Sequence, residues 1–148
     1  MKLFVTVFFL GFSPLMPGTA GALAGVLIFY FINHNLIIYW VITTCIIVLG
    51  IWLSGIAEKE IFKQKDSQHI VIDEVAGYLI SMSFFTLNDY WLYILLGFIL
   101  FRAFDILKPF PINKLQNLKG GFGVMLDDIL AGVYANIILQ LIRHFKLL

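Results

Sequence analysis

Residues 36–56 read LIIYWVITTCIIVLGIWLSGI, a run without Asp, Glu, Lys or Arg. A helix needs about 20 mainly apolar residues to cross the hydrocarbon core of a bilayer, so this run predicts a membrane-spanning helix. The rest of the chain agrees, because 61% of its 148 residues are hydrophobic and only 13% are charged. Ordinary soluble chains have roughly 45–50% and about 25%. A compact soluble chain of this length could not hide so much apolar surface, so we predict an integral membrane protein.

Four further apolar stretches flank this run and are candidates for spanning helices. The five candidates together are residues 20–32, 36–56, 70–87, 91–107 and 124–142. Residues 3–12 are too few to span and predict a short interfacial or re-entrant segment. Backbone groups in hydrocarbon must be satisfied internally, and neither a period of two nor a longer repeat is visible, so we expect helices. The predicted fold is all-α, a polytopic membrane helix bundle of about five spans in a single domain covering residues 1–148.

The lysines predict which helix ends face the cytoplasm. Several lysines lie in the connections at residues 57–69 and 108–123, whereas those at 33–35 and 88–90 carry neither lysine nor arginine. By the positive-inside rule, the lysine-bearing connections and residues 1–19 are cytoplasmic. Five spans would put Arg143 and Lys146 outside, so either the rule fails there or the last helix does not fully cross. The net charge of +1 and the lack of a basic stripe predict no nucleic-acid partner.

Three groups of ionisable residues stand at the predicted cytoplasmic ends of the spans. They are Asp73 with Glu74, then Arg102, Asp105 and Lys108, and finally Asp127 with Asp128. The residues of the middle group are three apart and therefore share one helix face. Ionisable residues in spans are energetically unfavourable, usually face inward and usually have a function. We expect the three groups to meet in one site at the membrane edge.

Such a site is suited to Mg²⁺, because carboxylate oxygens are hard ligands. We predict that Asp73, Glu74, Asp127 and Asp128 bind the metal and take part in catalysis, together with Asp105. Adjacent helix residues point about 100° apart, so only one of each pair is expected to reach the metal directly. The alternative is that the aspartates only stabilise helix N-termini. The number of charged groups on one predicted face favours a function instead.

The basic residues and glycines near these acids predict a phosphate site. Arg102 and Lys108 are expected to offset the acidic excess and to hold phosphate oxygens. Gly120 and Gly121 allow a ligand to approach the backbone closely, and the helix N-terminus that follows favours anions. A metal, acids and cations at the bilayer surface are typical of a site for a phosphorylated lipid head group.

Three blocks of sequence resemble the phosphatidylglycerophosphatase A family. They are residues 13–19 (SPLMPGT), residues 70–77 (IVIDEVAG), and residues 101–112 (FRAFDILKPFPI) continuing through 120–128 (GGFGVMLDD). The resemblance, which extends to about residue 135, implies a multi-pass enzyme at the cytoplasmic face of the bacterial inner membrane. It implies Mg²⁺-dependent hydrolysis of phosphatidylglycerophosphate to phosphatidylglycerol and phosphate, a step of phospholipid biosynthesis. The residues assigned to substrate binding are Arg102, Lys108, Thr19, Gly120 and Gly121.

The attacking group and one alternative function remain open. No Asp-x-Asp segment, phosphate-loop cysteine or suitably placed histidine is present, which favours a metal-activated water. A carboxylate nucleophile, Asp127 or Asp128, is the alternative. The alternative function is a small transporter or ion-coupled carrier, although its acids would lie near the bilayer midplane. A lipid phosphotransferase and a membrane scaffold have less support. The sequence leaves oligomeric state, metal number and acyl-chain preference undetermined.

Overall fold

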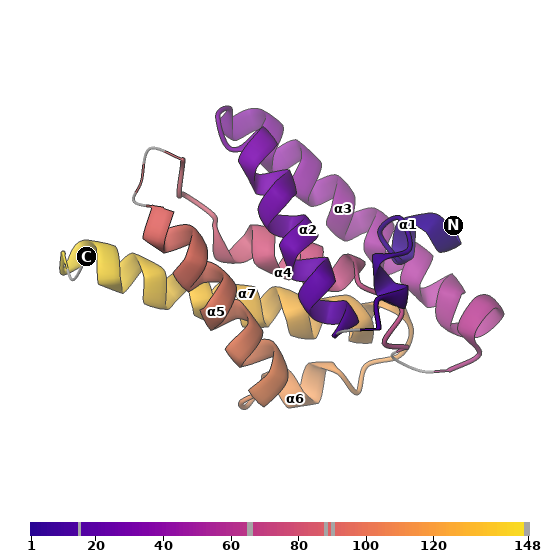
Figure 1. The fold of residues 1–148 in the computed structure, drawn as a ribbon. Helices are drawn as coiled ribbons and strands as arrows, with labels where there is room; N and C mark the ends of the chain where they lie inside the picture. Colours follow the sequence, from indigo (N-terminus) through magenta and orange to yellow (C-terminus); the bar gives the residue numbers. More distant parts are fainter. Residues whose placement is uncertain (15, 65–66, 88, 90, 147–148) are drawn as a thin grey trace.

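The computed structural model describes residues 1–14, 16–64, 67–87, 89 and 91–146, and its regular elements there are all helices. In chain order they are α1 (Lys2–Val5), the 3-10 helix η1 (Leu10–Phe12), α2 (Pro17–Ile32), α3 (Leu36–Ile56), the π-helix η2 (Ala57–Phe62), α4 (Ile72–Ser81), α5 (Trp91–Leu107), α6 (Ile112–Leu115) and α7 (Gly121–His144). Figure 1 shows α4 and α7 across the middle of the molecule, with α2 and α5 on the near side and α3 behind. The helical class predicted from the sequence is confirmed.

The prediction of about five membrane spans is wrong. Within the described part of the chain, two helices are long and apolar enough to cross a membrane, Leu36–Phe62 (α3 continued by η2) and α7. The other three predicted spans form shorter helices: α2 has 16 residues, α4 has 10 and α5 has 17. The two long apolar helices indicate membrane association, and a multi-pass bundle of five spans is not supported.

Helix α4 explains why the count of spans was too high. Eight of its ten residues are buried by the surrounding helices, so its apolar side chains are covered by protein. Only four of the 21 residues of α3 are buried. Both stretches are apolar in sequence, but composition does not tell a helix that faces lipid from one that lies in the protein core.

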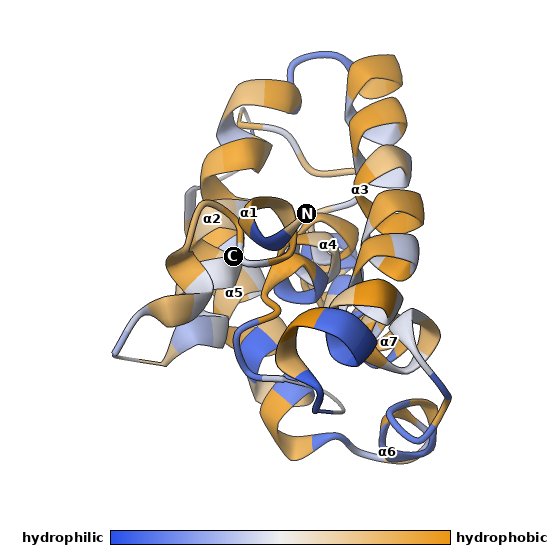
Figure 2. Cartoon of the chain, turned by 90° about the vertical axis from the view of Figure 1, so that its right-hand side faces the viewer, coloured by the Kyte–Doolittle hydropathy of each residue, from blue (hydrophilic) through white to orange (hydrophobic). Residues whose placement is uncertain are grey.

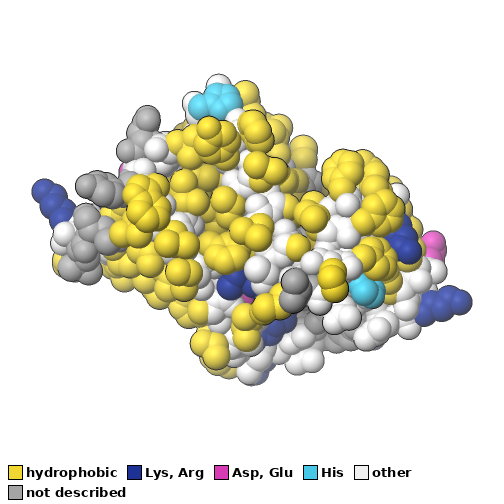
Figure 3. Space-filling view, in the orientation of Figure 1, with side chains coloured by type: hydrophobic (Ala, Val, Ile, Leu, Met, Phe, Trp, Pro, Cys, Tyr) yellow, Lys and Arg dark blue, Asp and Glu magenta, His cyan; other side chains and the backbone are white. Residues whose placement is uncertain are grey.

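Helices α2, α3 and α5 carry much of the exposed apolar surface of the molecule. Helix α3 exposes large side chains such as Ile37 (76% exposed) and Trp52 (63% exposed). In Figure 2, α3 is hydrophobic along most of its length, and hydrophilic residues gather in the lower half of the view, around α6. Figure 3 shows hydrophobic side chains over most of the face that contains α2 and α5. Exposed apolar areas this extensive are typical of surfaces that contact lipid.

Glycines let α4 and α7 cross at short range. A Cβ atom on Gly132 of α7 would lie 2.2 Å from the carbonyl oxygen of Gly77 on α4. A Cβ atom on Gly77 would lie 2.7 Å from the carbonyl oxygen of Asp128. Small residues at a crossing allow two helix backbones to approach closely, as in helix pairs within membranes. This crossing places the beginning of α4 beside the acidic segment of α7.

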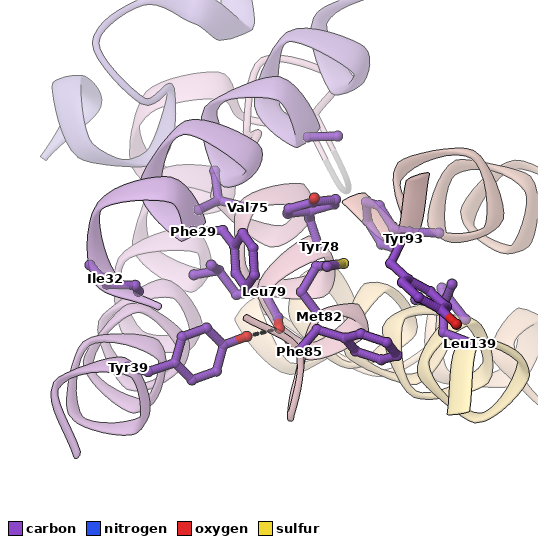
Figure 4. Close-up of a cluster of buried hydrophobic side chains, with 14 of the residues drawn as sticks. Phe29, Ile32, Tyr39, Val75, Tyr78, Leu79, Met82, Phe85, Tyr93 and Leu139 are labelled. Carbon is purple, nitrogen blue, oxygen red and sulfur yellow. Dashed lines mark hydrogen bonds between the residues drawn. The ribbon is translucent and has the colours of Figure 1, made fainter. Parts of the chain in front are cut away.

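Aromatic side chains fix α4 against α2 and α3. The ring of Phe29 on α2 makes edge contacts with Tyr39 on α3 and with Tyr78 on α4, at centroid distances of 6.2 Å and 6.5 Å. The Tyr39 hydroxyl donates a hydrogen bond to the carbonyl oxygen of Leu79, drawn as a dashed line in Figure 4. Phe29, Tyr78 and Leu79 are fully buried. This core holds the C-terminal half of α4, while its N-terminal half carries the acids.

The N-terminal segment does not form one continuous helix. Helices α1 and η1 are separated by residues with positive φ angles, and Phe8 among them is 73% exposed. The segment is attached to the loop before α4, because Val71 N–H donates to the carbonyl oxygen of Val5 at 2.9 Å. Its placement in a membrane interface stays a prediction.

Candidate active site

Three carboxylates from α4 and α7 form a buried cluster. Asp73 and Glu74 lie in the first turn of α4, and Asp128 lies in the second turn of α7. Their ligand atoms all lie within 4.8 Å of one another. Asp73 is only 7% exposed and Asp128 only 3%. We call Asp73, Glu74 and Asp128 the carboxylate cluster. Such close burial of three acids is unfavourable unless protons or cations offset their charge.

The effect of burial and of neighbouring negative charges is seen in the pKa of Glu74. Burial raises its pKa to about 8, and the negative charges of Asp128 and Asp105 act in the same direction. A hydrogen bond with Asp73 and the positive charge of Arg102 lower the pKa and only partly compensate. The Oε2 atom of Glu74 is buried and has no hydrogen-bond partner among the described residues.

The carboxylate cluster fits a hard divalent cation. Carboxylate oxygens are the ligands that Mg²⁺ prefers, and it usually binds through one or two of them together with water and substrate phosphates. A cation would satisfy the unpartnered Oε2 atom of Glu74 and keep this carboxylate ionised, because metal binding displaces protons. The donor types and their burial are therefore compatible with the predicted Mg²⁺.

Helix α5 adds a cation beside the cluster. Arg102 forms an ion pair with Asp105, and its Nη1 atom lies 4.0 Å from Oε1 of Glu74. The side chain of Arg102 is 14% exposed, and that of Asp105 is 12% exposed. The buried Nε atom of Arg102 has no hydrogen-bond acceptor among the described residues. Asp105 therefore holds one side of the guanidinium, while Nε can donate to an anionic ligand.

Lys108 and Asp127 form a second ion pair at the same end of the molecule. The Nζ atom of Lys108, just after α5, lies 2.6 Å from Oδ2 of Asp127. The side chain of Asp127 is 3% exposed and that of Lys108 is 23% exposed. The pair links α5 to α7 next to the carboxylate cluster. Of the four carboxylates predicted to bind metal, Asp127 is the one outside the cluster.

The N-terminus of α2 also borders the cluster, through a residue that the sequence analysis did not single out. A Cβ atom on Gly18 would lie 2.3 Å from Oε1 of Glu74 and 2.9 Å from Nη1 of Arg102. Glycine at this position lets α2 begin beside both charged groups without displacing the ends of their side chains. The only indication of its importance in the sequence was that Gly18 lies in the 13–19 block. Thr19 is the next residue of α2 and is partly buried, and its role in substrate binding stays a prediction.

Gly120 and Gly121 contact α3. A Cβ atom on Gly121 would lie 1.8 Å from the carbonyl oxygen of Ile51, so this glycine allows α7 to begin against α3. Gly120 has φ +64° and ψ −157°, a conformation almost restricted to glycine. Both line a cavity of about 660 Å³ between α3 and the beginning of α7, whose lining residues include none of the carboxylate cluster. These contacts give both glycines a packing role, and their binding of substrate stays a prediction.

Comparison with known proteins identifies the family. A model of the phosphatidylglycerophosphatase A family matches residues 3–143, nearly the whole chain. The chain belongs to the phosphatidylglycerophosphatase A family. It is a lipid phosphatase, and the transporter alternative is set aside. The match includes the carboxylate cluster and both ion pairs.

Three bacterial relatives are similar to this chain, and two of them carry the name of the family. Phosphatidylglycerophosphatase A of Escherichia coli is 36% identical over 138 residues, covering 90% of this chain and 78% of the relative. The Haemophilus influenzae protein of the same name is 37% identical over 134 residues, covering 88% and 81%. A Bacteroides thetaiotaomicron protein named "Putative phosphatidylinositol-3-phosphatase" is 41% identical over 141 residues, covering 90% and 87%. No solved structure matches the chain.

Proposed function

We propose that this protein hydrolyses the terminal phosphomonoester of phosphatidylglycerophosphate, giving phosphatidylglycerol and phosphate, with Mg²⁺ bound by Asp73, Glu74 and Asp128. The observation that carries the proposal is the carboxylate cluster, whose ligand atoms lie within 4.8 Å of one another beside the Arg102 guanidinium. Membership of the phosphatidylglycerophosphatase A family supports the substrate.

The carboxylate cluster provides the metal ligands in this mechanism. Mg²⁺ held by these residues would act as a Lewis acid that offsets charge on the phosphoryl oxygens and makes a water more acidic. In the hydrolysis, the oxygen of a water forms a bond to phosphorus, the bond from phosphorus to the glycerol oxygen breaks, and one proton of that water is transferred to the glycerol oxygen. We favour water as the nucleophile because Asp127 is already paired with Lys108 and Asp128 belongs to the carboxylate cluster that would hold the metal.

Arg102 binds the phosphoryl group. Its guanidinium has a buried Nε donor without a partner among the described residues, and charge-assisted hydrogen bonds to phosphate are stronger than neutral ones. Asp105 orients the guanidinium through the ion pair on α5. Lys108, held by Asp127, adds a second positive charge near the transferred group. Preorganised cations of this kind stabilise charge that develops in the transition state.

A phosphatidylinositol 3-phosphate head group is a second candidate substrate. The relative named for that activity is 41% identical, compared with 36% and 37% for the two relatives named phosphatidylglycerophosphatase A. Both substrates are phosphomonoesters of membrane lipids, so the same carboxylates and Arg102 serve either one. Discrimination depends on groups that contact the alcohol side of the ester.

We place the active site at the cytoplasmic face of the bacterial inner membrane. The supporting observation is the distribution of lysines, since Lys108, Lys114 and Lys119 lie in the connection that leads from α5 to α7. Positively charged residues near the ends of membrane helices are enriched on the cytoplasmic side.

Phosphate release from defined lipids tests the proposed function. Purified protein in mixed micelles is given either phosphatidylglycerophosphate or phosphatidylinositol 3-phosphate, with Mg²⁺ or with excess chelator. We expect release from the first lipid that stops on chelation and returns with added Mg²⁺. Faster release from the inositol lipid would assign the second candidate, and full activity in chelator would exclude the metal-dependent mechanism.

A further inference from the structure

An apolar groove lies between α2 and α5, outside the catalytic machinery. Its volume is about 400 Å³, within the range of small-molecule binding sites. All of its lining side chains are apolar: Leu23 and Val26 from α2, and Trp91, Ile94, Leu95 and Phe98 from α5. Trp91 is 68% exposed, so the groove is open to the surroundings of the protein. The two helices run side by side in Figure 1, on the face drawn in Figure 3.

The groove is continuous with the active site along both helices. On α5 its residues are at positions 91, 94, 95 and 98, a spacing that places them on one face of the helix, and Arg102 follows Phe98 one turn later on this face. On α2, Leu23 comes one turn after Thr19. The two helices meet the active site together, because Gly18 at the start of α2 touches both Arg102 and Glu74.

We propose that this groove binds an acyl chain of the lipid whose phosphate is hydrolysed at Arg102. The inference rests on the proposed function and assigns a binding site to the hydrophobic part of the substrate. The groove is apolar from Trp91 to Phe98, and charge begins at Arg102, so it complements a molecule with one anionic end. Arg102 is eleven positions after Trp91, which corresponds to about 16 Å along a helix. One leaflet of the hydrocarbon core is about 15 Å thick, so the distance from Arg102 to the far end of the groove at Trp91 matches the length of an acyl chain.

Matched substitutions on each helix test the groove. Leu23 and Leu27 are both on α2 and are 54% and 59% exposed, but only Leu23 lines the groove. Leu95 and Ile99 on α5 are 45% and 51% exposed, and only Leu95 lines it. We expect Leu23→Trp and Leu95→Trp to fill the groove, whereas Leu27→Trp and Ile99→Trp serve as controls with the same introduced side chain and similar exposure.

The readout is chain-length preference. In detergent, kcat/KM is measured for phosphatidylglycerophosphate with long acyl chains and for the same head group with short chains. Loss of contact with about two methylene groups lowers kcat/KM by roughly tenfold, so the groove variants should lose about tenfold on the long-chain lipid only. Equal losses of kcat/KM on both lipids, or equal losses in the control variants, would refute the binding of an acyl chain in the groove. An inactive parent protein would instead refute the proposed function itself.

A binding measurement covers the case in which the tryptophan variants fail to fold. A protein that retains only Trp91, with Trp40→Phe and Trp52→Phe, is mixed with micelles that contain a small fraction of lipid brominated on its chains. We expect brominated phosphatidylglycerophosphate to quench Trp91 fluorescence at a severalfold lower fraction than brominated phosphatidylcholine. A protein that retains only Trp52 should respond equally to both lipids. Equal quenching of Trp91 would exclude the proposal, and a change of oligomeric state in Leu23→Trp would assign the groove to a second copy instead.

Discussion

Helices α4 and α7 each carry two adjacent carboxylates near their N-terminal ends, and the two pairs have different surroundings. Asp73 and Glu74 of α4 both belong to the carboxylate cluster. On α7 only Asp128 belongs to it, while Asp127 is paired with Lys108 at 2.6 Å. Helix α4 is covered on most sides, so both of its acids are enclosed, whereas α7 meets α4 on one side and the end of α5 on the other. The helix that lies next to each carboxylate therefore determines whether it belongs to the carboxylate cluster.

The largest expected effect follows removal of charge from the cluster. Glu74→Gln and Asp128→Asn should each lower kcat by roughly a thousandfold, because metal-based stabilisation of the transition state is worth several kcal/mol. Phosphate release and Mg²⁺ binding are measured on the same preparations. Glu60→Gln, an exposed change on η2, is the matched control. Since the substitutions keep the side-chain shape, folding should be nearly unchanged, and activity within tenfold of the parent would refute the role of the cluster.

The next largest effect is expected from a change in the distance between α4 and α7. Gly132→Ala places a methyl group 2.2 Å from the carbonyl oxygen of Gly77, so α7 must move away from α4. A displacement of about 1 Å at a catalytic centre lowers the rate by roughly a hundredfold, and we expect a loss of this size in kcat together with a lower Tm. Gly97→Ala is the control, because its methyl group meets the flexible side chain of Met82. Similar activities of the two variants would mean that the crossing does not set the geometry of the cluster.

A smaller loss of activity is expected when the ion pair of Lys108 and Asp127 is broken. Asp127→Asn and Lys108→Met should each lower kcat/KM by roughly tenfold to a hundredfold, because a charge-assisted hydrogen bond contributes about 1.5–3 kcal/mol. The double variant should be little worse than the more damaged single one, since residues that act through one contact are not additive. Lys63→Met, an exposed change, is the control. Fully additive losses would show that Lys108 and Asp127 act separately.

The smallest effect is on pH-dependent stability. Because the pKa of Glu74 is raised from 4.5 to about 8, the unfolded chain releases this proton at lower pH than the folded protein. Without Mg²⁺, Tm should therefore fall as pH rises from 4.5 to 8. Mg²⁺ requires the ionised carboxylate, so it should raise Tm by a few degrees more at pH 8.5 than at pH 6. Glu74→Gln should abolish this difference in thermal unfolding scans, and a difference that persists in this variant would assign the pH dependence to another group.

Much of the candidate site follows from local sequence patterns. Spacing on α5 places Arg102 and Asp105 on one face, and the structure shows them as an ion pair. The bounds of α3 agree with the predicted stretch 36–56, since an uncharged apolar run of that length has few structures other than a helix. By contrast, the contact of Gly18 with Glu74 and Arg102 depends on residues far apart in the chain, and sequence spacing says nothing about it.

The sequence by itself determined the helical class, the apolar character and the acidic and basic residues of the candidate site, because these depend on residue type and local period. The tertiary structure alone decided how many helices can span a membrane, since the apolar stretches of the sequence include both α4, which is buried by protein, and α3, which is mostly exposed. The tertiary structure alone also showed that Asp128 belongs to the carboxylate cluster, whereas Asp127 is paired with Lys108. Adjacent side chains on a helix point about 100° apart, and only the packing of α4 and α5 around α7 determines what each one meets.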